Sequence, residues 1–362
     1  MRKKNKILFI YNKNKGGGAE DVMSNLFSRF EKDHDNLDKY LTHQKNNKII
    51  SILIKFRIVR ILVSIFSLIK YCIFYKTRVI SALHEENLVA CILFNRPILT
   101  VHNSEMPKGI KYLFVYILYQ YLAPFKKARV ICVSKGLLNM YREKFTNCSC
   151  ELIYNGIDIL DKDIKVNECS DKVLMIGRFV NQKNHITGIK IFQEAYKYNN
   201  NLSMTIVGEG PLLADYIEYI NNNKLQDKIK IIGWTENIEL IYRAHNVLLF
   251  PSKFEGFGNV LVEALYCGLS VVASDCDWGP REILSSYPTD GTISEFTTNF
   301  EIGTLININY NFSTETIQTS AQALLKYNQK SKAKVKDAFQ NHIHQYTVNT
   351  CYQKYDYILN HT

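Results

Sequence analysis

The sequence predicts an α/β protein with two doubly wound domains that face a central cleft, and three observations support this prediction. The chain has 362 residues, a length that fits two domains of roughly 150–200 residues better than one ordinary core. Short apolar runs alternate with helical patterns in both halves, as in parallel sheets covered by helices. A polar and charged stretch at 159–171 separates the two series of elements.

The first half begins as a strand, a glycine turn and a helix. Apolar residues at 6–11 predict the strand, Gly16, Gly17 and Gly18 the turn, and the pattern at 19–30 the helix. The alternation continues with strand-like runs and helical stretches, in chain order 78–82, 84–94, 98–102, 110–122 and 129–133. We therefore expect a parallel sheet in a first domain that spans residues 1–165.

The second half repeats this arrangement after the polar stretch. A new strand over 173–176 leads into Gly177 and Arg178. Further strands, separated by helices, are expected near 203–207, 229–232, 247–250, 270–273 and 304–306. A second domain is thus predicted over 166–340, and a C-terminal helix over 341–362 is expected to pack back on the first domain.

Composition narrows the classes of partner. Apolar residues make up 46% and charged residues 22% of the chain, as in globular proteins. The 45 Lys and Arg against 34 Asp and Glu give a formal charge of +11, which favours nucleic acid, anionic lipid headgroups or phosphorylated substrates. No basic stretch is interleaved with aromatic residues as in single-strand binders, and no zinc-finger spacing occurs. We therefore expect no nucleic-acid partner.

The cysteines and the N-terminal residues indicate a cytoplasmic location. The nine cysteines are scattered and stand mostly inside apolar runs, as buried thiols of a reducing compartment do. Cys148 and Cys150 form a close pair, but no second pair or nearby histidine completes a zinc site. The apolar run at 7–11 is shorter than the ~7–15 residues of a secretory signal. A strand is the better interpretation of that run.

The stretch 49–75 differs from its surroundings. Its longest uncharged run, 61–69, is too short to span a bilayer. A polar stripe follows at steps of three and four, formed by Arg57, Arg60, Ser64, Ser67 and Tyr71. Such a helix is either buried in the protein or lies in a membrane surface, where a basic stripe would face anionic headgroups. We expect a peripheral contact with the inner face of the cytoplasmic membrane.

The segment 251–284 is the most informative part of the sequence about function. A loop with two glycines follows the strand at 247–250, and a helix is expected to begin near Asn259. Glu255 lies in the loop and Glu263 in the first turns of the helix, so both can face one ligand at the helix N-terminus. Free N–H groups there, which we assign to Asn259, Val260 and Leu261, would suit a diphosphate.

Hydroxyl groups are better partners than phosphate for the two carboxylates, because like charges repel. Glu263 can bridge vicinal ribose hydroxyls, and Glu255 can accept from the hydroxyls of a transferred sugar. After the strand at 173–176, Arg178 and Lys183 can neutralise a diphosphate leaving group. The plainer alternatives are a helix cap for Glu263, a solvated Glu255 and two solvated cations on a surface loop.

Two features of the first domain carry weaker signals. Gly17 and Gly18 let the backbone approach a ligand closely, although G-x-G-x-x-G, the P-loop and G-x-S-x-G are all absent. His102 ends a strand-like run where side chains meet the cleft, and it is either functional or structural. His342 and His344 are two positions apart, which does not place a metal pair on one helix face. Because Lys and Arg can carry phosphate charge, no metal or other cofactor is required.

These motifs together resemble glycosyltransferase family 4, a group of retaining enzymes with the GT-B fold. The E-x7-E pattern lies in FEGFGNVLVEALYCG at 254–268. Supporting motifs occur in the expected order: GGGAE at 16–20, VHN at 101–103, VSKGL at 133–137, YNGID at 154–158, GRFVNQKNH at 177–185, VGEGP at 207–211 and GW at 233–234. The resemblance covers nearly the whole chain, apart from the stretch between the first helix and residue 78.

The resemblance implies a GT-B fold of two Rossmann-like domains, the first binding an acceptor and the second a nucleotide sugar. It also implies retention at the anomeric carbon without a metal, and catalytic roles for Glu255, Lys183, Arg178 and His102. The implied donor contacts are Gly17, Gly18, Arg178, Lys183, Gly233, Glu255, Gly256, Phe257, Gly258, Asn259, Val260, Leu261 and Glu263. The expected donor is a UDP-sugar, and the expected acceptor is a lipid-diphosphate-linked glycan of O-antigen (lipopolysaccharide) or capsule biosynthesis.

Two rival functions remain open. A GT-B sugar-nucleotide epimerase would use a similar cleft without an acceptor, so acceptor-free conversion of a UDP-sugar would favour it. A non-catalytic nucleotide- or carbohydrate-binding module would bind without turnover. Intact Glu255, Glu263, Arg178 and Lys183 argue against such a module.

Overall fold

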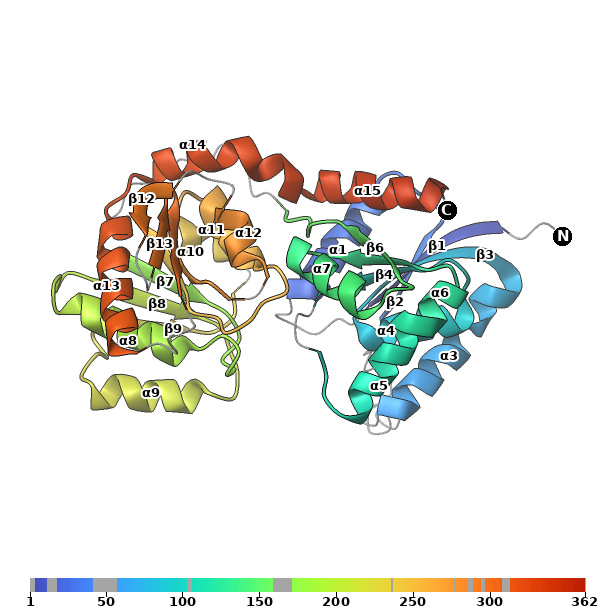
Figure 1. Cartoon of the computed structure of the whole chain (residues 1–362), viewed down its shortest axis with the longest axis horizontal. Helices are drawn as coiled ribbons and strands as arrows, with labels where there is room; N and C mark the ends of the chain where they lie inside the picture. The colour runs from blue at the N-terminus through green and yellow to red at the C-terminus, as the bar shows by residue number, and fades with distance from the viewer. Residues whose placement is uncertain are drawn as a thin grey trace. The chain divides into compact units, whose positions relative to one another are not determined.

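The chain divides into two compact units. The computed structural model describes residues 4–11, 18–41, 57–102, 106–158, 171–235, 237–276, 278–285, 289–293, 297–307 and 313–361. Unit 1 comprises Met1–Asp158 and Thr347–Thr362, and unit 2 comprises Ile159–Tyr346. Each unit is a sheet covered by helices (Figure 1), which confirms the predicted fold class. The expected boundary at 165/166 lies outside the described residues.

The sheet of unit 1 is parallel throughout, in the order β2-β1-β3-β4-β5-β6. Its strands are β1 (Lys4–Tyr11), β2 (Leu37–Leu41), β3 (Tyr75–Ala82), β4 (Ile98–Val101), β5 (Arg129–Cys132) and β6 (Ser149–Leu152). The four strands expected in this half are confirmed, whereas β2 and β6, which are short and mix polar with apolar residues, were not predicted. The strand order reverses at β1, which is where open α/β sheets bind ligands.

Helices cover both faces of this sheet. They are α1 (Gly18–Phe30), α3 (Arg57–Phe74), α4 (His84–Leu93), α5 (Ile110–Ile117), η1 (Leu118–Leu122), α6 (Ala123–Phe125), α7 (Lys135–Lys144) and α15 (Val348–His361). In Figure 1, α1 and α15 lie on one face, and α3, α4 and α5 lie on the other. The expected helix over 110–122 is present, but its second part, η1, is wound as a π-helix.

The aromatic core of unit 1 includes residues from α15. Phe9 of β1 meets Phe27 and Phe30 of α1 edge to face, with ring centroids 5.4 Å apart in both pairs. Tyr352 of α15 packs against Phe30 at 4.7 Å. On the same helix, the Tyr355 hydroxyl lies 2.7 Å from Thr100 Oγ1 of β4. The segment after residue 346 therefore completes the core of a sheet whose strands all come before residue 153.

The predicted single helix over 341–362 differs from the structure. Instead, α14 (Lys332–Ile343) ends in the 3-10 turn η3 (His344–Tyr346), and α15 begins after Thr347. The Thr347 hydroxyl accepts a hydrogen bond from the backbone N–H of Thr350 at 3.1 Å. This contact caps a new helix, so the chain starts α15 separately.

The sheet of unit 2 is parallel except at one edge, with the order β12-β13-β14-β11-β10-β7-β8-β9. Its strands are β7 (Lys172–Ile176), β8 (Ser203–Val207), β9 (Ile229–Ile232), β10 (Val247–Phe250), β11 (Ser270–Ser274), β12 (Thr289–Ile293), β13 (Thr297–Phe300) and β14 (Gly303–Ile306). All six expected strands are confirmed. The antiparallel pairs β12–β13 and β13–β14 were not predicted, because these segments lack a sustained apolar run.

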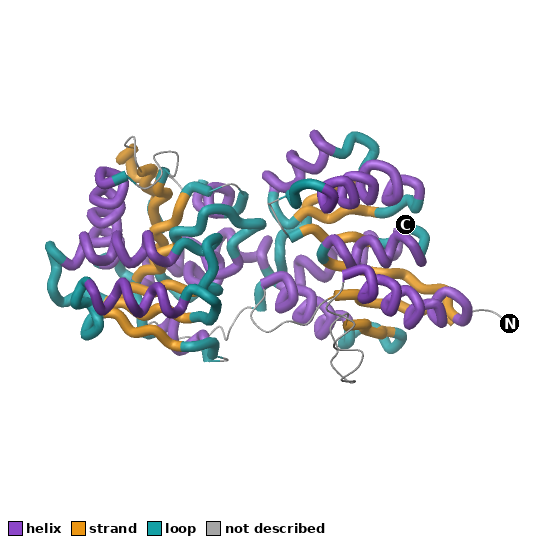
Figure 2. The backbone as a smooth tube through the Cα atoms, turned by 90° about the horizontal axis from the view of Figure 1, so that it is seen from below, coloured by secondary structure: helices purple, strands orange, loops and turns teal. Residues whose placement is uncertain are grey.

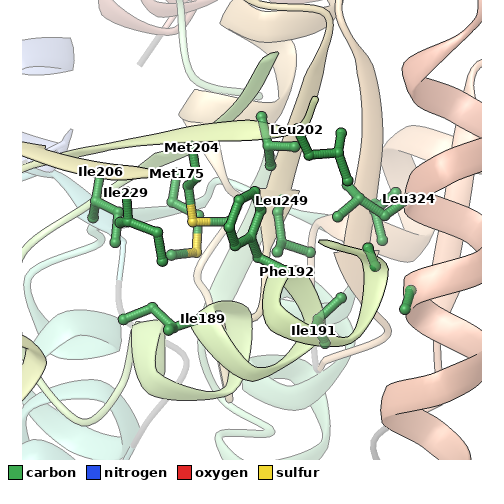
Figure 3. Close-up of a cluster of buried hydrophobic side chains, with 14 of the residues drawn as sticks. Met175, Ile189, Ile191, Phe192, Leu202, Met204, Ile206, Ile229, Leu249 and Leu324 are labelled. Atoms are coloured by element: carbon green, nitrogen blue, oxygen red, sulfur yellow. The ribbon is translucent and has the colours of Figure 1, made fainter. Parts of the chain in front are cut away.

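Helices also flank the second sheet, as Figure 2 shows for both units. They are α8 (His185–Tyr196), α9 (Leu213–Asn222), α10 (Ile238–Arg243), α11 (Asn259–Tyr266), α12 (Pro280–Leu284), α13 (Thr314–Asn328), α14 and η3. Ile189 and Phe192 of α8 reach Met175, Met204 and Leu249 on three neighbouring strands (Figure 3). This packing holds the carboxyl ends of β7, β8 and β10 in a fixed register.

The described part of the stretch 49–75 is helical up to Phe74, and Tyr75 begins β3. Helix α3 covers its residues from Arg57 to Phe74, and 49–56 lie outside the described residues. Within the described parts of the chain, no helix combines the length and the apolar character that crossing a bilayer requires.

Tyr355→Ala is expected to destabilise unit 1, because it leaves a cavity in the core and removes the partner of Thr100. Phe or Trp to Ala changes in cores cost about 3–5 kcal/mol, and we expect a loss near the lower end of that range. Tyr357, on the same helix, is 63% exposed, so Tyr357→Ala serves as the control and should change stability by less than about 0.5 kcal/mol. Chemical denaturation measures both variants, and equal effects would contradict the role of α15 in the core.

Candidate functional site

The loops after β7 and β10 are joined to each other at the carboxyl edge of the sheet in unit 2. The backbone N–H of Lys253 donates to the carbonyl of Gln182 at 2.8 Å. The Gln182 side chain donates to the carbonyl of Phe254 at 2.9 Å, and the Asn184 side chain donates to that of Pro251 at 3.2 Å. Three hydrogen bonds therefore fix one loop against the other, although the two segments are about seventy residues apart in sequence.

An ion pair lies between these two loops. Lys183 Nζ is 2.6 Å from Glu255 Oε1, and the two side chains are 17% and 8% exposed. The ammonium also lies 5.2 Å from the ring centroid of Phe250, the last residue of β10. Water screens such a pair less than a surface pair, so both charges are held in place at the strand ends. Lys183 and Glu255, two of the four residues predicted as catalytic, thus contact each other directly.

Arg178 differs from Lys183 in its surroundings. Its side chain is exposed, and the described residues provide no acidic partner for its guanidinium within ion-pair distance. The loop that carries both cations is short, because its start and end are fixed by β7 and α8. One cation of the predicted pair is therefore held by Glu255, and the other is open to solvent.

A third loop, after β8, packs tightly on the first. Phe179 N–H donates to the carbonyl of Glu209 at 2.8 Å. At Gly208, where φ is +152°, a Cβ would lie 2.0 Å from the carbonyl oxygen of Gly177. Only glycine allows this approach, so the VGEGP motif sets the position of the loop after β7. Gly233 is exposed beside the same loop, where Glu209 accepts a hydrogen bond from Trp234 N–H at 3.3 Å.

Glu263 lies in the second turn of α11 and is held by a tyrosine. The hydroxyl of Tyr242, on α10, donates to Glu263 Oε2 at 2.6 Å. Tyr242 is fully buried, and burial together with the neighbouring carboxylate raises its pKa well above the usual value. The phenol is therefore a permanent donor, and it fixes one oxygen of the carboxylate that was predicted to bind ribose.

A buried lysine supports the helix that carries Tyr242. Lys332 Nζ, at the start of α14, donates to the carbonyl of Arg243 at 2.8 Å and to that of Tyr242 at 3.4 Å. The whole Lys332 residue is inaccessible to solvent. Neither Tyr242 nor Lys332 was found from the sequence. No motif or spacing marks them, because Tyr242 meets Glu263, and Lys332 meets α10, only through the tertiary fold.

The start of α11 corrects one expectation. The N–H of Leu261 is not free, since it donates to the carbonyl of Gly258 at 2.9 Å. Gly258 itself precedes the helix with φ of 95°, so the chain tightens into a turn there. Leu261 and Phe257 are buried, and Phe257 packs on Tyr346 with centroids 5.5 Å apart, so their side chains do not line a polar site. Gly256, Asn259 and Val260 are partly exposed.

The predicted site residues of the first domain belong to unit 1. His102 follows β4 and is 8% exposed, and burial lowers its pKa to about 4, so its imidazole is neutral near physiological pH. Its Nε2 is buried without a hydrogen-bond partner within the part of the chain that is described. Gly18 begins α1, and Gly17 lies outside the described residues. The structure thus brings Lys183 to Glu255 and Tyr242 to Glu263 within unit 2, and His102 lies in the other unit.

Comparison with known proteins shows which proteins this chain is similar to. Residues 157–305, which include the Lys183–Glu255 and Tyr242–Glu263 contacts but neither Lys332 nor Tyr346, match the sequence model of the family Glycosyl transferases group 1. Solved structures with the same architecture are GT-B glycosyltransferases, so the fold is the GT-B fold. One of them is HepE of Anabaena in complex with UDP, with a TM-score of 0.69, 17% identity, and coverage of 99% of this chain and 100% of that chain.

Two curated relatives are glycosyltransferases by name. One is the N-acetylgalactosamine-N,N'-diacetylbacillosaminyl-diphospho-undecaprenol 4-alpha-N-acetylgalactosaminyltransferase of Campylobacter jejuni, 33% identical over 156 residues, 41% of this chain and 42% of the relative. The other is the amylovoran biosynthesis glycosyltransferase AmsD of Erwinia amylovora, 31% identical over 129 residues, 36% of this chain and 35% of the relative. The chain therefore matches less than half the length of either relative.

A buried histidine beside the site predicts how stability depends on pH. His185 packs edge to face on Phe179 with centroids 5.3 Å apart, and burial, together with Lys183, lowers its pKa to about 3. Since the unfolded state takes up this proton first, the free energy of unfolding falls as pH drops from the unfolded pKa of about 6.5 towards 3.

Denaturation of wild type and His185→Gln at several pH values measures this effect. The wild type should lose about 2–3 kcal/mol more than the variant by a pH of about 4.5. His361→Gln is the control, because His361 is exposed. Parallel pH curves for wild type and His185→Gln would show that His185 is not the group responsible.

Proposed function

We propose that the chain is a retaining hexosyltransferase that moves a hexose or N-acetylhexosamine from a UDP-sugar to a lipid-linked oligosaccharide. The observation that carries this proposal is the pair of fixed carboxylates, Glu255 against Lys183 in the loop after β10 and Glu263 against Tyr242 on the following helix, α11. Both carboxylates fall within the segment that matches the group 1 family. HepE, which has the same fold, was solved with UDP.

Each side chain has a task in this proposal. Glu263 accepts hydrogen bonds from the ribose, and Glu255 accepts them from the transferred sugar. Arg178 and Lys183 neutralise the diphosphate, whose negative charge grows as the glycosidic bond breaks. Gly17 and Gly18 approach the phosphates, and neutral His102 can donate to or accept from the sugar. The backbone of 256–261 and Gly233 complete the donor contacts, and no metal takes part.

The Lys183–Glu255 ion pair changes the catalytic role of Lys183. Its Nζ is already 2.6 Å from a carboxylate, so it acts on the donor while bonded to Glu255. An ammonium has three N–H groups, which allows both contacts at once. The exposed Arg178 is the cation that can move towards the diphosphate, and the bound Lys183 is the one that is already positioned.

The proposed reaction is a substitution on one face of the anomeric carbon. The bond from this carbon to the diphosphate oxygen breaks, and the bond to the acceptor hydroxyl oxygen forms on the same face. The hydroxyl proton passes to the leaving diphosphate, so no protein nucleophile is needed. The protein contributes position and charge stabilisation, which are the main means of catalysis in such a site.

The proposed acceptor is a lipid-diphosphate-linked glycan of bacterial surface polysaccharide assembly. The name of the Campylobacter jejuni relative includes such a diphospho-undecaprenol acceptor, and AmsD is named for the biosynthesis of amylovoran. An acceptor with a lipid anchor stays at a membrane, and we propose that the enzyme acts there from the cytoplasm as a peripheral protein. Segment 49–75, of which α3 is described, would contribute to that contact.

A screen of the purified protein against UDP-, GDP- and ADP-sugars tests the proposal directly. Thermal shift reports binding, and slow nucleotide release reports the reactivity of the bond. A response to one UDP-sugar supports the proposal and fixes the donor. Conversion to an epimer without acceptor would identify an epimerase, and UDP binding without turnover on any lipid-linked acceptor would identify a binding module. No response to any nucleotide would overturn the proposal.

Lys183→Ala should lower turnover by about 10²–10³, the usual loss when one preorganised electrostatic group is removed. Lys253→Ala is the matched control, because this exposed lysine lies on the adjoining loop. Removal of one partner from a buried ion pair also destabilises a protein by several kcal/mol, so thermal unfolding of both variants must accompany the kinetics. Normal turnover in a folded Lys183→Ala protein would exclude Lys183 from the mechanism.

The role of Glu263 is best tested by changing ligand and protein together. Glu263→Ala should weaken UDP binding about tenfold, because a hydrogen bond to a charged group is lost. Tyr242→Phe should weaken it less, and it should also reduce the affinity difference between UDP and 2'-deoxy-UDP, since the carboxylate is no longer fixed. Calorimetry gives all of these affinities.

Tyr327→Phe is the control for this experiment. Tyr327 is another fully buried tyrosine of unit 2, and its hydroxyl donates to the carbonyl of Phe300 at 2.6 Å. It should lose stability as Tyr242→Phe does, while its affinities for UDP and 2'-deoxy-UDP remain unchanged. If Tyr242→Phe keeps the full preference for UDP over the deoxy ligand, Tyr242 does not position Glu263.

A further inference from the structure

Exposed apolar side chains are concentrated on one group of helices in unit 1. Thirteen of the nineteen large hydrophobic residues that are exposed in the described part of the chain lie between residues 62 and 125. Five belong to α3, one to α4 and seven to α5, η1 and α6. Single exposed apolar residues are common on proteins, whereas a concentration of this size indicates an interaction surface.

The exposed residues of α3 form one stripe. Leu62, Phe66, Ile69 and Ile73 follow at steps of four, three and four, which places them on the same helix face. Phe66 is 81% exposed. Of the predicted polar stripe, Ser64 is buried, Tyr71 is half-buried and Ser67 is exposed. The exposed apolar stripe lies on the opposite side of the helix.

A second stripe continues from α5 through η1 to α6. Its members follow at steps of four, three, four and four: Ile110, Phe114, Ile117, Tyr121 and Phe125. Phe125 is 80% exposed and Ile110 73%. The opposite side of the same helices is buried through Val115, Leu118 and Tyr119. The sequence assigned this stretch only as a helix covering the sheet.

The two stripes lie on the same face of the sheet in unit 1. Helix α4 contacts α3 as well as η1, and Figure 1 shows α3, α4 and α5 on the face opposite α1 and α15. We refer to the exposed residues of α3 and of α5, η1 and α6 together as the apolar face. Its two stripes flank α4 and are not separated by the sheet.

The two segments that carry the apolar face hold basic residues and no acidic ones. Neither 57–82 nor 106–127 contains an Asp or a Glu. Five exposed lysines stand in these two segments: Lys70, Lys76, Lys108, Lys111 and Lys127. Apolar and aromatic side chains surrounded by lysines are the composition that binds the interface of an anionic bilayer. Two copies of this face would instead bring like charges together, which opposes self-association.

We propose that the apolar face docks on an anionic lipid bilayer, with the stripes of α3 and of α5, η1 and α6 inserted together among the headgroups. This goes beyond the contact expected from 49–75, because the larger share of the exposed apolar residues lies on α5, η1 and α6. The helices lie on the bilayer and do not cross it. The proposal does not depend on the transfer reaction. Nucleotide binding in unit 2 can be measured in the same preparation, so the two proposals can be tested separately.

Flotation of the full chain with vesicles tests the proposal. We expect binding to vesicles of phosphatidylcholine with phosphatidylglycerol, weaker binding to pure phosphatidylcholine, and a decrease with added salt. Phe114→Ser and Phe66→Ser should each weaken binding about tenfold, because each removes one inserted side chain. Lys111→Glu should weaken it by about fivefold or more.

Matched controls come from unit 2. Leu240 is 61% exposed, as Phe114 is 56% exposed, and Lys230 is an exposed lysine. Leu240→Ser and Lys230→Glu should leave vesicle binding unchanged. Circular dichroism of each variant verifies folding, and UDP binding shows whether unit 2 is intact. Loss of UDP binding with normal flotation would concern the proposed function alone.

Phe114→Trp provides a second measurement that does not remove the apolar side chain. Its emission should shift to shorter wavelength with anionic vesicles, and brominated lipid should quench it. Leu240→Trp should show neither change. Equal flotation of wild type, Phe66→Ser and Phe114→Ser would overturn the proposal. So would a concentration-dependent dimer that Phe114→Ser abolishes, since the face would then bind a second copy.

Discussion

The joining of the loops after β7 and β10 is the constraint on which the site of unit 2 depends. Strands β7 and β10 are parallel neighbours, so their carboxyl ends meet at one edge, and Gln182 and Asn184 then fasten the two loops through backbone carbonyls. Asn184 adopts the left-handed conformation with φ of 51°, which asparagine tolerates better than most residues. Lys183 stands between these two amides, and its pairing with Glu255 follows from their positions. The ion pair is therefore a result of the loop geometry as much as a cause of it.

The carboxylate of Glu263 is held by contacts of another kind. Glu263 depends on a buried phenol, and the helix that carries this phenol depends in turn on a buried ammonium. A solvent-free lysine is costly unless its N–H groups are bonded, and Lys332 meets this requirement with helix-terminal carbonyls, which carry partial negative charge. Helix α14 thus supports α10, and α10 in turn holds the Glu263 side chain of α11. Glu255 is fixed by loops and Glu263 by helices, so the two acceptors are supported independently.

The sequence predicts the parts of this molecule that depend on local pattern. Apolar runs locate the expected strands, and the E-x7-E spacing locates Glu255 and Glu263 around the start of α11. Strands β2 and β6 were missed, because their short segments mix polar and apolar residues and their pairing depends on the neighbouring strands. Tyr242 was missed for the same reason, since 21 positions separate it from Glu263. For α3, periodicity located the polar stripe but not the side of the helix that is covered. Helix α4 and strand β3 both pack against α3, so this side depends on the tertiary fold.

The path of the chain has a consequence for how the protein is made. Residues from two distant parts of the sequence build the core of unit 1, whereas unit 2 is continuous between them. A ribosome completes the strands of unit 1 first, but the core stays open towards α1 until Tyr352 and Tyr355 have been synthesised. All residues of unit 2 are therefore synthesised before unit 1 is complete, although the synthesis of unit 2 starts later. Until then, apolar residues of β1 and α1 stay exposed in nascent unit 1. Binding by a chaperone would protect the chain most at this stage of translation.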